Sequence, residues 1–202
     1  MKYMQRNGEN DMSDRITMTA DNALKKLMDG NKRYVETNTN HGDVSSAIRL
    51  KTSCKGQEPF AVVVTCSDSR VIPETIFSAS IGELFVIRVA GNVIDDHQLG
   101  SIEYAASHLG TRLIVVMGHT NCGAIGAAFH PDDDNKYIRF ILHEIRSAIG
   151  DETDPDKACI LNVKHSVAAI EESLEIQKEE HEHSLKVVGA LYHIDTGEVE
   201  LL

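Results

Sequence analysis

No stretch of this 202-residue chain is apolar over the length that a membrane span requires. Residues 1–18 are polar and lack the apolar run on which a signal peptide depends. We therefore expect a cytoplasmic protein with no membrane partner, in which residues 1–18 form a flexible arm ahead of the folded domain.

Basic residues are scarce as well. The chain has 20 Lys and Arg against 31 Asp and Glu, which gives a net charge of −11. A protein that binds along nucleic-acid phosphates needs an excess of positive charge, so we expect no nucleic-acid partner. The expected partners are small molecules and further copies of this chain. Two charge runs, at residues 132–134 and 178–183, are interpreted as solvated surface.

Closely spaced cysteine pairs are absent, which excludes a CxxC redox motif and argues against a disulfide framework. The four cysteines, Cys54, Cys66, Cys122 and Cys159, are far apart in the sequence. In a reducing compartment, such isolated thiols indicate metal binding or simple burial.

The chain that remains after residue 18 is long enough for one domain, which we place at residues 19–202. Four short apolar runs rich in β-branched residues predict buried strands at residues 60–65, 84–89, 113–117 and 185–192. A turn signal at residues 195–197 predicts that residues 198–202 form an antiparallel edge strand.

Helical patterns alternate with these runs. An N-terminal helix is predicted to begin after a capping Thr19, and apolar spacing of three and four predicts helices at residues 138–145 and 160–174. Alternation of strands and helices is typical of an α/β fold. We therefore expect a mainly parallel central sheet flanked by helices, with an N-terminal helical arm.

Chemically distinctive residues follow two of the predicted strands. Cys66 comes directly after the first run, and His119 and Cys122 follow the third. Ligands in open α/β folds gather at the carboxyl ends of strands, so these side chains meet if the two strands are neighbours. Cys and His are preferred zinc ligands, and three of them with one open position are typical of a catalytic site. Zn²⁺ is therefore the expected cofactor.

Two alternatives stay open from the residues alone. A lone cysteine is often simply buried, and Cys54 or Cys159 could complete a closed structural zinc site. Cys159 falls on an apolar helical pattern and Cys54 precedes the first strand, which fits burial or surface better. Asn121 is predicted to cap a helix that begins near Gly123, so that the helix dipole favours a thiolate at Cys122.

Asp68 and Arg70 lie two positions apart, so on an extended segment their side chains leave on the same side. An arginine can hold a carboxylate through a forked pair of hydrogen bonds and keep it ionised beside a metal. An ordinary ion pair is the alternative. We expect both residues to be catalytic.

Four segments carry a resemblance to a known family: CSDSRV at residues 66–71, ELFVIRVAGN at 83–92, SIEYA at 101–105 and GHTNCGA at 118–124. They resemble the β-class carbonic anhydrases, and the similarity extends from residue 20 to the C-terminus. The resemblance implies zinc held by Cys66, His119 and Cys122, a catalytic pair of Asp68 and Arg70, and a homodimer or a larger homo-oligomer. It also implies that the N-terminal helix embraces a neighbouring subunit.

The same resemblance implies a pocket for carbon dioxide and bicarbonate, with Gln57 entering from the subunit interface. The residues it assigns to substrate binding are Gln57, Phe85, Ala90, Tyr104 and Gly123. Phe85, Ala90 and Tyr104 could instead be plain core residues, and Gln57 could be only a turn residue. Val89 replaces the Asn of many members, and the absence of Trp excludes the inhibitory bicarbonate pocket that some members build around a tryptophan.

The implied reaction is reversible hydration of carbon dioxide by zinc-bound hydroxide. Asp68 would orient that hydroxide, or would bind the zinc itself at low pH and return to Arg70 at high pH. An alternative within enzymes is hydrolysis of carbon disulfide or carbonyl sulfide on the same scaffold. A zinc-dependent scaffold or bicarbonate sensor is the non-enzymatic alternative, and the intact Asp68 and Arg70 argue against it.

Overall fold

The computed structural model describes residues 18–130 and 136–202. The predicted arm, apart from Met18, and the charge run at 132–134 lie outside the described residues. In chain order the elements are α1 (Ala20–Thr37), α2 (Ser46–Lys55), β1 (Ala61–Thr65), α3 (Pro73–Ile76), β2 (Leu84–Arg88), the 3-10 turn η2 (Ala90–Asn92), α4 (Asp96–Leu109), β3 (Leu113–His119), α5 (Gly123–Ala128), α6 (Ile138–Ile149), α7 (Pro155–Glu171), α8 (Leu174–His183), β4 (Lys186–Tyr192) and β5 (Val199–Leu201).

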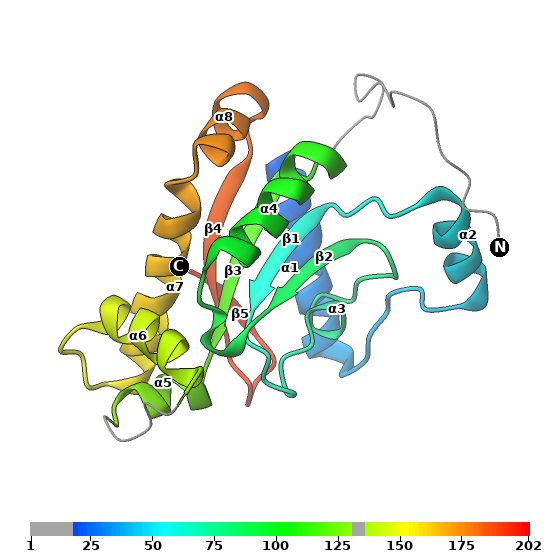
Figure 1. Ribbon diagram of the computed structural model, residues 1–202. Coiled ribbons are helices and arrows are strands. Elements are labelled where there is room, and N and C mark those ends of the chain that lie inside the picture. Colours follow the sequence, from blue (N-terminus) through cyan, green and yellow to red (C-terminus); the bar gives the residue numbers. More distant parts are fainter. Residues whose placement is uncertain (1–17, 131–135) are drawn as a thin grey trace.

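One sheet forms the centre of the molecule, with its strands in the order β2-β1-β3-β4-β5 (Figure 1). The pairs β1–β2, β1–β3 and β3–β4 are parallel, and β5 pairs antiparallel with β4. The predicted α/β fold, its mainly parallel sheet and its antiparallel edge strand are therefore confirmed. Because β1 and β3 are neighbours in parallel register, with Thr65 opposite Met117, their carboxyl ends lie side by side.

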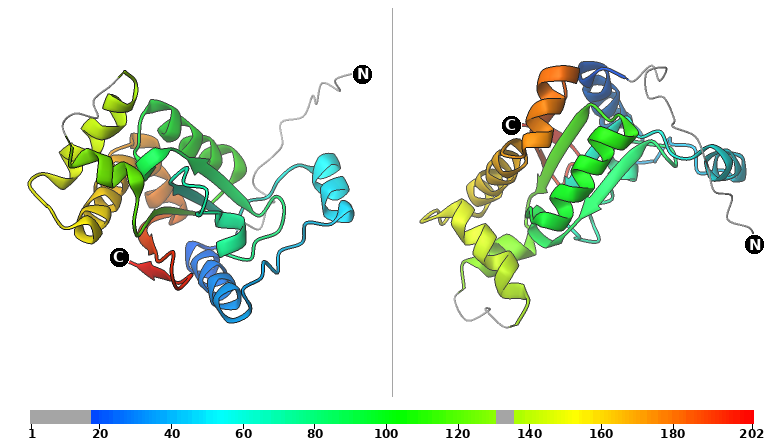
Figure 2. Two further views of the ribbon diagram at one scale, coloured as in Figure 1. Left: turned by 90° about the horizontal axis from the view of Figure 1, so that it is seen from below. Right: turned by 45° about the horizontal axis from the view of Figure 1, so that its top comes forward.

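Helices cover both faces of this sheet, and the alternation of side chains along each strand decides which face each residue joins. In β1, Ala61 and Val63 pack in one core cluster with α1 and α3. Val62 and Val64 pack in a second cluster with residues of α4, α7 and α8. Figure 2 shows the resulting layers, with α1 on one side of the sheet and α4 and α7 on the other.

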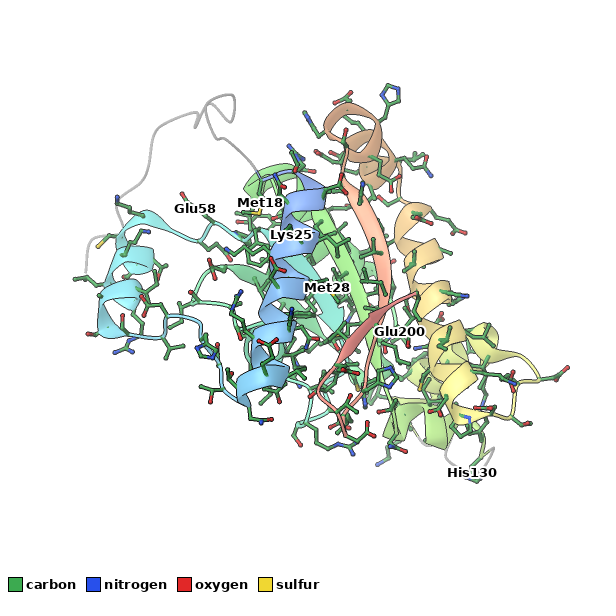
Figure 3. The ribbon with its side chains drawn as sticks, turned by 180° about the vertical axis from the view of Figure 1, so that it is seen from behind. Met18, Lys25, Met28, Glu58, His130 and Glu200 are labelled. Atoms are coloured by element: carbon green, nitrogen blue, oxygen red, sulfur yellow. The ribbon has the colours of Figure 1, made fainter. Side chains whose placement is uncertain are left out.

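Helix α1 begins where the sequence predicts, since the side chain of Thr19 accepts a hydrogen bond from the backbone of Asn22. It lies across the back of the sheet, with Lys25 on its outer surface (Figure 3). Its buried stripe, which includes Ala23 and Leu27, packs on the chain's own sheet. The helix that the resemblance expected to embrace a neighbour thus has its apolar face covered within one chain.

Helix α2 was not predicted, and it has no buried residue. It projects away from the sheet in Figures 1 and 2. A helix without a buried face carries no apolar periodicity, so the pattern that identifies the other helices is missing here. Its N-terminus is set instead by the cap Ser45, whose side chain accepts from the backbone of Ile48.

The predicted single helix at residues 160–174 is wrong at its end. Helix α7 stops at Glu171, and the side chain of Ser173 caps a separate helix, α8. Leu174, the last member of the apolar series, is therefore 82% exposed. The charge run at 178–183 is also not uniformly solvated, because Glu179 is buried and pairs with Arg112, the residue before β3.

Across the described parts of the chain, no helix combines the length and apolar character needed to cross a membrane. The expected location in the cytoplasm stays a prediction.

Candidate functional site

The carboxyl ends of β1 and β3 bring Cys66, His119 and Cys122 together. One donor atom from each lies within 4.8 Å of the other two, and all three residues are buried. Cys66 follows the last residue of β1, His119 ends β3, and Cys122 immediately precedes α5. The predicted convergence is confirmed, and the fold supplies a buried Cys-His-Cys cluster.

His119 is oriented for metal binding by its other ring nitrogen. Nδ1 lies 3.0 Å from the carbonyl oxygen of Thr120 and donates to it, which leaves the lone pair on Nε2. Nε2 is fully buried and has no hydrogen-bond partner among the described residues. A buried nitrogen of this kind is costly unless it has a partner, and a metal ion between it and the two sulfurs satisfies it. The residues therefore fit a metal.

The two thiols of the cluster do not ionise alike. A hydrogen bond from Cys122, with support from the backbone N–H of Gly91, lowers the pKa of Cys66 well below its usual value in spite of burial. The hydrogen bond that Cys122 donates to Cys66, together with burial and the charge on Cys66, raises the pKa of Cys122 above its usual value. Two buried thiolates side by side repel each other, so the doubly ionised pair is favoured only when a cation neutralises it.

The start of α5 differs from the prediction in one detail. Cys122 itself is the N-cap residue, and Asn121 lies one position before it, with a left-handed backbone (φ of 55°). The backbone N–H groups of Ile125 and Ala124 nevertheless favour the Cys122 thiolate, as the helix argument expected. The carbonyl of Asn121 accepts a hydrogen bond from Arg70 at 3.1 Å.

Asp68 and Arg70 form the forked pair that the sequence suggested. The guanidinium donates from Nε to Oδ1 at 2.9 Å and from its terminal nitrogen to Oδ2 at 2.7 Å. The backbone N–H of Arg70 also donates to Oδ1, at 2.9 Å. This pairing holds the pKa of Asp68 well below its usual range, against a smaller opposing effect of burial. Asp68 Oδ2 is also 3.9 Å from His119 Nε2, so the carboxylate borders the cluster.

Arg88, at the end of β2, was missed by the sequence analysis. Its guanidinium donates to the carbonyl of Asp68 at 2.7 Å and to that of Cys66 at 3.2 Å. Arg88 therefore holds the backbone of the segment that carries both Cys66 and the Asp68 carboxylate. The only hint in the sequence is a charged residue inside the otherwise apolar run at residues 84–89.

Gly91, in the turn η2, was also missed. Its backbone N–H donates to Cys66 Sγ at 3.3 Å, and its φ of 70° suits glycine. A Cβ atom there would come within 2.7 Å of Ile145 Cδ1. A glycine flanked by small and polar residues is a weak sequence signal, because its contact with sulfur depends on the fold.

The five residues assigned to substrate binding divide into two groups. Ala90 lies in η2, next to Gly91, and Gly123 follows Cys122, so both adjoin the cluster. Phe85 and Tyr104 contact each other, with ring centroids 6.2 Å apart. Phe85 pairs with Val62, four residues before Cys66, which at the usual strand rise is about 13 Å along the sheet.

Gln57 lies farther still from the cluster within one chain. It is exposed and follows α2. The backbone N–H of its neighbour Glu58 donates to the carbonyl of Gly82, which precedes β2. This places Gln57 at the amino end of the sheet, opposite the edge that carries Cys66. Within a single chain, Gln57, Phe85 and Tyr104 are thus not brought to the cluster.

Comparison with known proteins gives a consistent match. The family described as "Carbonic anhydrase" matches residues 61–199. Carbonic anhydrase 2 of Mycobacterium tuberculosis is 36% identical over 189 residues, which cover 89% of this chain and 91% of that protein.

Solved structures agree. A structure from a study of two tetrameric β-carbonic anhydrases of Sordaria macrospora superposes with a TM-score of 0.72 at 25% identity, covering 78% of this chain and 87% of that one. The Coccomyxa β-carbonic anhydrase gives a TM-score of 0.71 at 27% identity, covering 89% and 86%.

Proposed function

The chain belongs to the β-class carbonic anhydrase family, and from this premise we propose that it catalyses the reversible hydration of carbon dioxide to bicarbonate and a proton. The observation that carries the proposal is the buried convergence of Cys66, His119 and Cys122, with Nε2 of the histidine directed at no protein partner among the described residues. We further propose that zinc is the metal held there, because two thiolates and one imidazole suit it.

Zinc bound by these residues would lower the pKa of a bound water and polarise the oxygen of the substrate. The chain itself supplies the rest of the chemistry. The Gly91 N–H stabilises the Cys66 thiolate, and the Thr120 carbonyl fixes the ring of His119. Both contacts keep the donor atoms in place while the substrate exchanges.

Asp68 is the residue that we propose acts on the attacking water. Arg70 keeps its carboxylate ionised, so an oxygen is available as a hydrogen-bond acceptor at the border of the cluster. An acceptor there turns the water so that a lone pair faces the carbon of carbon dioxide. An Asp68 released from Arg70 would be free to hold the metal itself and block the site, which is the gating role we assign to the pair.

We propose that the working enzyme is a homo-oligomer. The two β-carbonic anhydrases studied from Sordaria macrospora are tetrameric, and in this chain Gln57, Phe85 and Tyr104 lie away from the cluster of the same subunit. A second copy is the simplest source of these groups for the pocket. Sedimentation equilibrium measures the assembly, and a monomer with full activity would contradict this part of the proposal.

Stopped-flow hydration of carbon dioxide on the zinc-loaded full chain tests the main proposal. We expect a zinc-dependent rate over roughly pH 7 to 9, the span at and above the usual pKa of a zinc-held water. His119→Ala, which lacks one ligand, is the matched control. No rate above background would refute the proposal, and zinc-dependent release of sulfide from carbonyl sulfide or carbon disulfide instead would support the alternative substrates.

A further inference from the structure

Helix α7 carries three buried polar residues on one face: Cys159, Asn162 and Ser166, at 3%, 1% and 2% exposure. Their spacing of three and four residues places them in one row along the helix. Buried polar groups are costly unless they are hydrogen-bonded, so a row of them on a helix that packs on the sheet requires specific partners. We call these residues the α7 anchors.

Each anchor donates to a backbone carbonyl next to the Cys-His-Cys cluster. Cys159 Sγ lies 3.3 Å from the carbonyl oxygen of His119. Asn162 Nδ2 lies 2.7 Å from that of Gly91, and Ser166 Oγ lies 3.0 Å from that of Asn92. The row therefore touches the end of β3 and the turn η2, which are the backbone segments on two sides of the cluster.

Gly91 is the residue through which this contact reaches a metal ligand. Its N–H donates to Cys66 Sγ, while its carbonyl accepts from Asn162. Both Gly91 and Asn92 have left-handed backbones, with φ of 70° and 47°. Glycine and asparagine adopt this conformation more readily than other residues, so the sequence suits the turn, and hydrogen bonds decide how its peptide groups are oriented.

Contacts with Ile145 and Ala124 hold the Cα atom of Gly91 in place, but they do not determine the direction in which its N–H and C=O groups point. Its Cα side faces Ile145 and Ala124, and a Cβ would lie 2.7 Å from the first and 3.2 Å from the second. Rotation of the peptide units is the remaining freedom. The unit after Gly91 is held at both ends, because its carbonyl accepts from Asn162 and its N–H, that of Asn92, donates to the carbonyl of Val89 at 3.0 Å. The bond from Ser166 fixes the next unit, and with Gly91 anchored on its carbonyl side, its own N–H keeps its direction toward Cys66.

We propose that Asn162 is a positioning residue of the metal centre, which holds the Gly91 turn so that its N–H points at the Cys66 sulfur. The inference rests on the metal site of the proposed function. A hydrogen bond to a ligand sulfur withdraws charge from it and fixes its direction, and partners of ligands commonly change metal affinity 10- to 100-fold when removed. Asn162 acts on the metal through Gly91 and Cys66 and touches neither metal nor substrate.

The test compares Asn162→Leu, of similar size but without a donor, with the wild-type full chain. Ser166→Ala is the matched control, because it removes a donor of the same row one peptide unit farther from Cys66. Zinc affinity is measured by competition with a chromophoric chelator. Cobalt-substituted protein reports the thiolate ligands through its sulfur-to-metal absorption band.

We expect Asn162→Leu to bind zinc about 10- to 100-fold more weakly and to shift the cobalt band, with a smaller effect in Ser166→Ala. A folded Asn162→Leu with wild-type zinc affinity and an unchanged band would overturn the inference. If that variant does not fold, Asn162→Ala removes the same donor without added bulk and decides by the same two measurements. A wild-type chain that binds zinc but does not hydrate carbon dioxide would refute the proposed function, whereas the affinity ratio would still decide the role of Asn162.

Discussion

Asp68 and His119 face each other across the edge of the cluster, with Oδ2 3.9 Å from Nε2. The histidine comes from the end of β3 and the aspartate from the segment after β1, so the contact exists only because these strands are neighbours. The carboxylate is therefore close enough to act on whatever His119 binds, while Arg70 holds it from the other side.

Asp68→Asn tests that role. The amide has the same shape but is a poorer acceptor, and the three ligands are untouched, so zinc content should stay at the wild-type value. We expect the rate of carbon dioxide hydration to fall about 10²- to 10⁴-fold, the range typical of a lost acid–base group. Stopped-flow assays alongside metal analysis check this, and an unchanged rate would remove Asp68 from the mechanism.

Arg70→Gln should move the acidic limb of the pH–activity profile to higher pH. Arg70 lowers the pKa of Asp68, so without it the carboxylate is protonated at a higher pH than in the wild type. Arg70→Lys keeps the charge without the fork and should lie between the two. The free energy of unfolding depends on pH for the same reason. Because the pKa of Asp68 is lower in the folded chain, its pair with Arg70 stabilises the fold above the ordinary Asp pKa of about 3.9 and stabilises it less as the pH falls. Superimposable acidic limbs would contradict the prediction.

Zinc binding at pH 7 should release about one proton from the two cysteines rather than two. In the metal-free chain the hydrogen bond between the two thiols lowers the pKa of Cys66 and raises that of Cys122, so the pair shares one negative charge before zinc binds. Cys159 does not contribute, because burial raises its pKa to about 11. Calorimetry in buffers of different ionisation enthalpy counts the protons. Release of two would show that neither cysteine is ionised beforehand.

Asn31→Ala should destabilise the fold without touching the cluster. Asn31 is buried on α1, donates to the carbonyls of Ile76 and Gly197, and accepts from the backbone of Val199. A buried polar group left unpaired costs about 1–3 kcal/mol, so we expect at least that loss in the free energy of unfolding.

Lys25→Ala is the control for this loss, because it removes an exposed ion pair on the same helix. Solvent screens such exposed pairs, so we expect a much smaller loss than in Asn31→Ala. Urea unfolding at equal zinc content measures both variants, since bound metal shifts apparent stability. An equal loss in the free energy of unfolding for both variants would contradict the conclusion that the buried hydrogen bonds of Asn31 stabilise the fold.

The sequence predicted the convergence of Cys66, His119 and Cys122 because these residue types are chemically distinctive and follow recognisable strands. Cys66 and His119 each stand at the end of an apolar run, where the rule for parallel sheets places ligands. Arg88, Gly91 and Asn162 could not be found in this way. They are common residue types, and their contacts with the cluster join positions 20 or more residues apart.

Errors in helix limits have a similar cause. The apolar spacing that runs through Ile170 to Leu174 is continuous in the sequence, but Ser173 provides a new cap and the chain turns there. Helix α2 shows the opposite case, because a helix that buries nothing has no periodic pattern to recognise. Local hydrogen bonding decided both points, and apolar periodicity does not report it.

By itself, the sequence determined the alternation of strands and helices, the parallel sheet with its antiparallel edge, and the three side chains that form the Cys-His-Cys cluster. These follow from local patterning and from the chemistry of single residues. Tertiary structure alone decided which strands are neighbours, that His119 Nε2 has no partner among the described residues, and that Asn162 supports the turn that contacts Cys66. The physical reason is that these facts depend on distances between segments far apart in the chain, and packing fixes such distances only when the whole core forms.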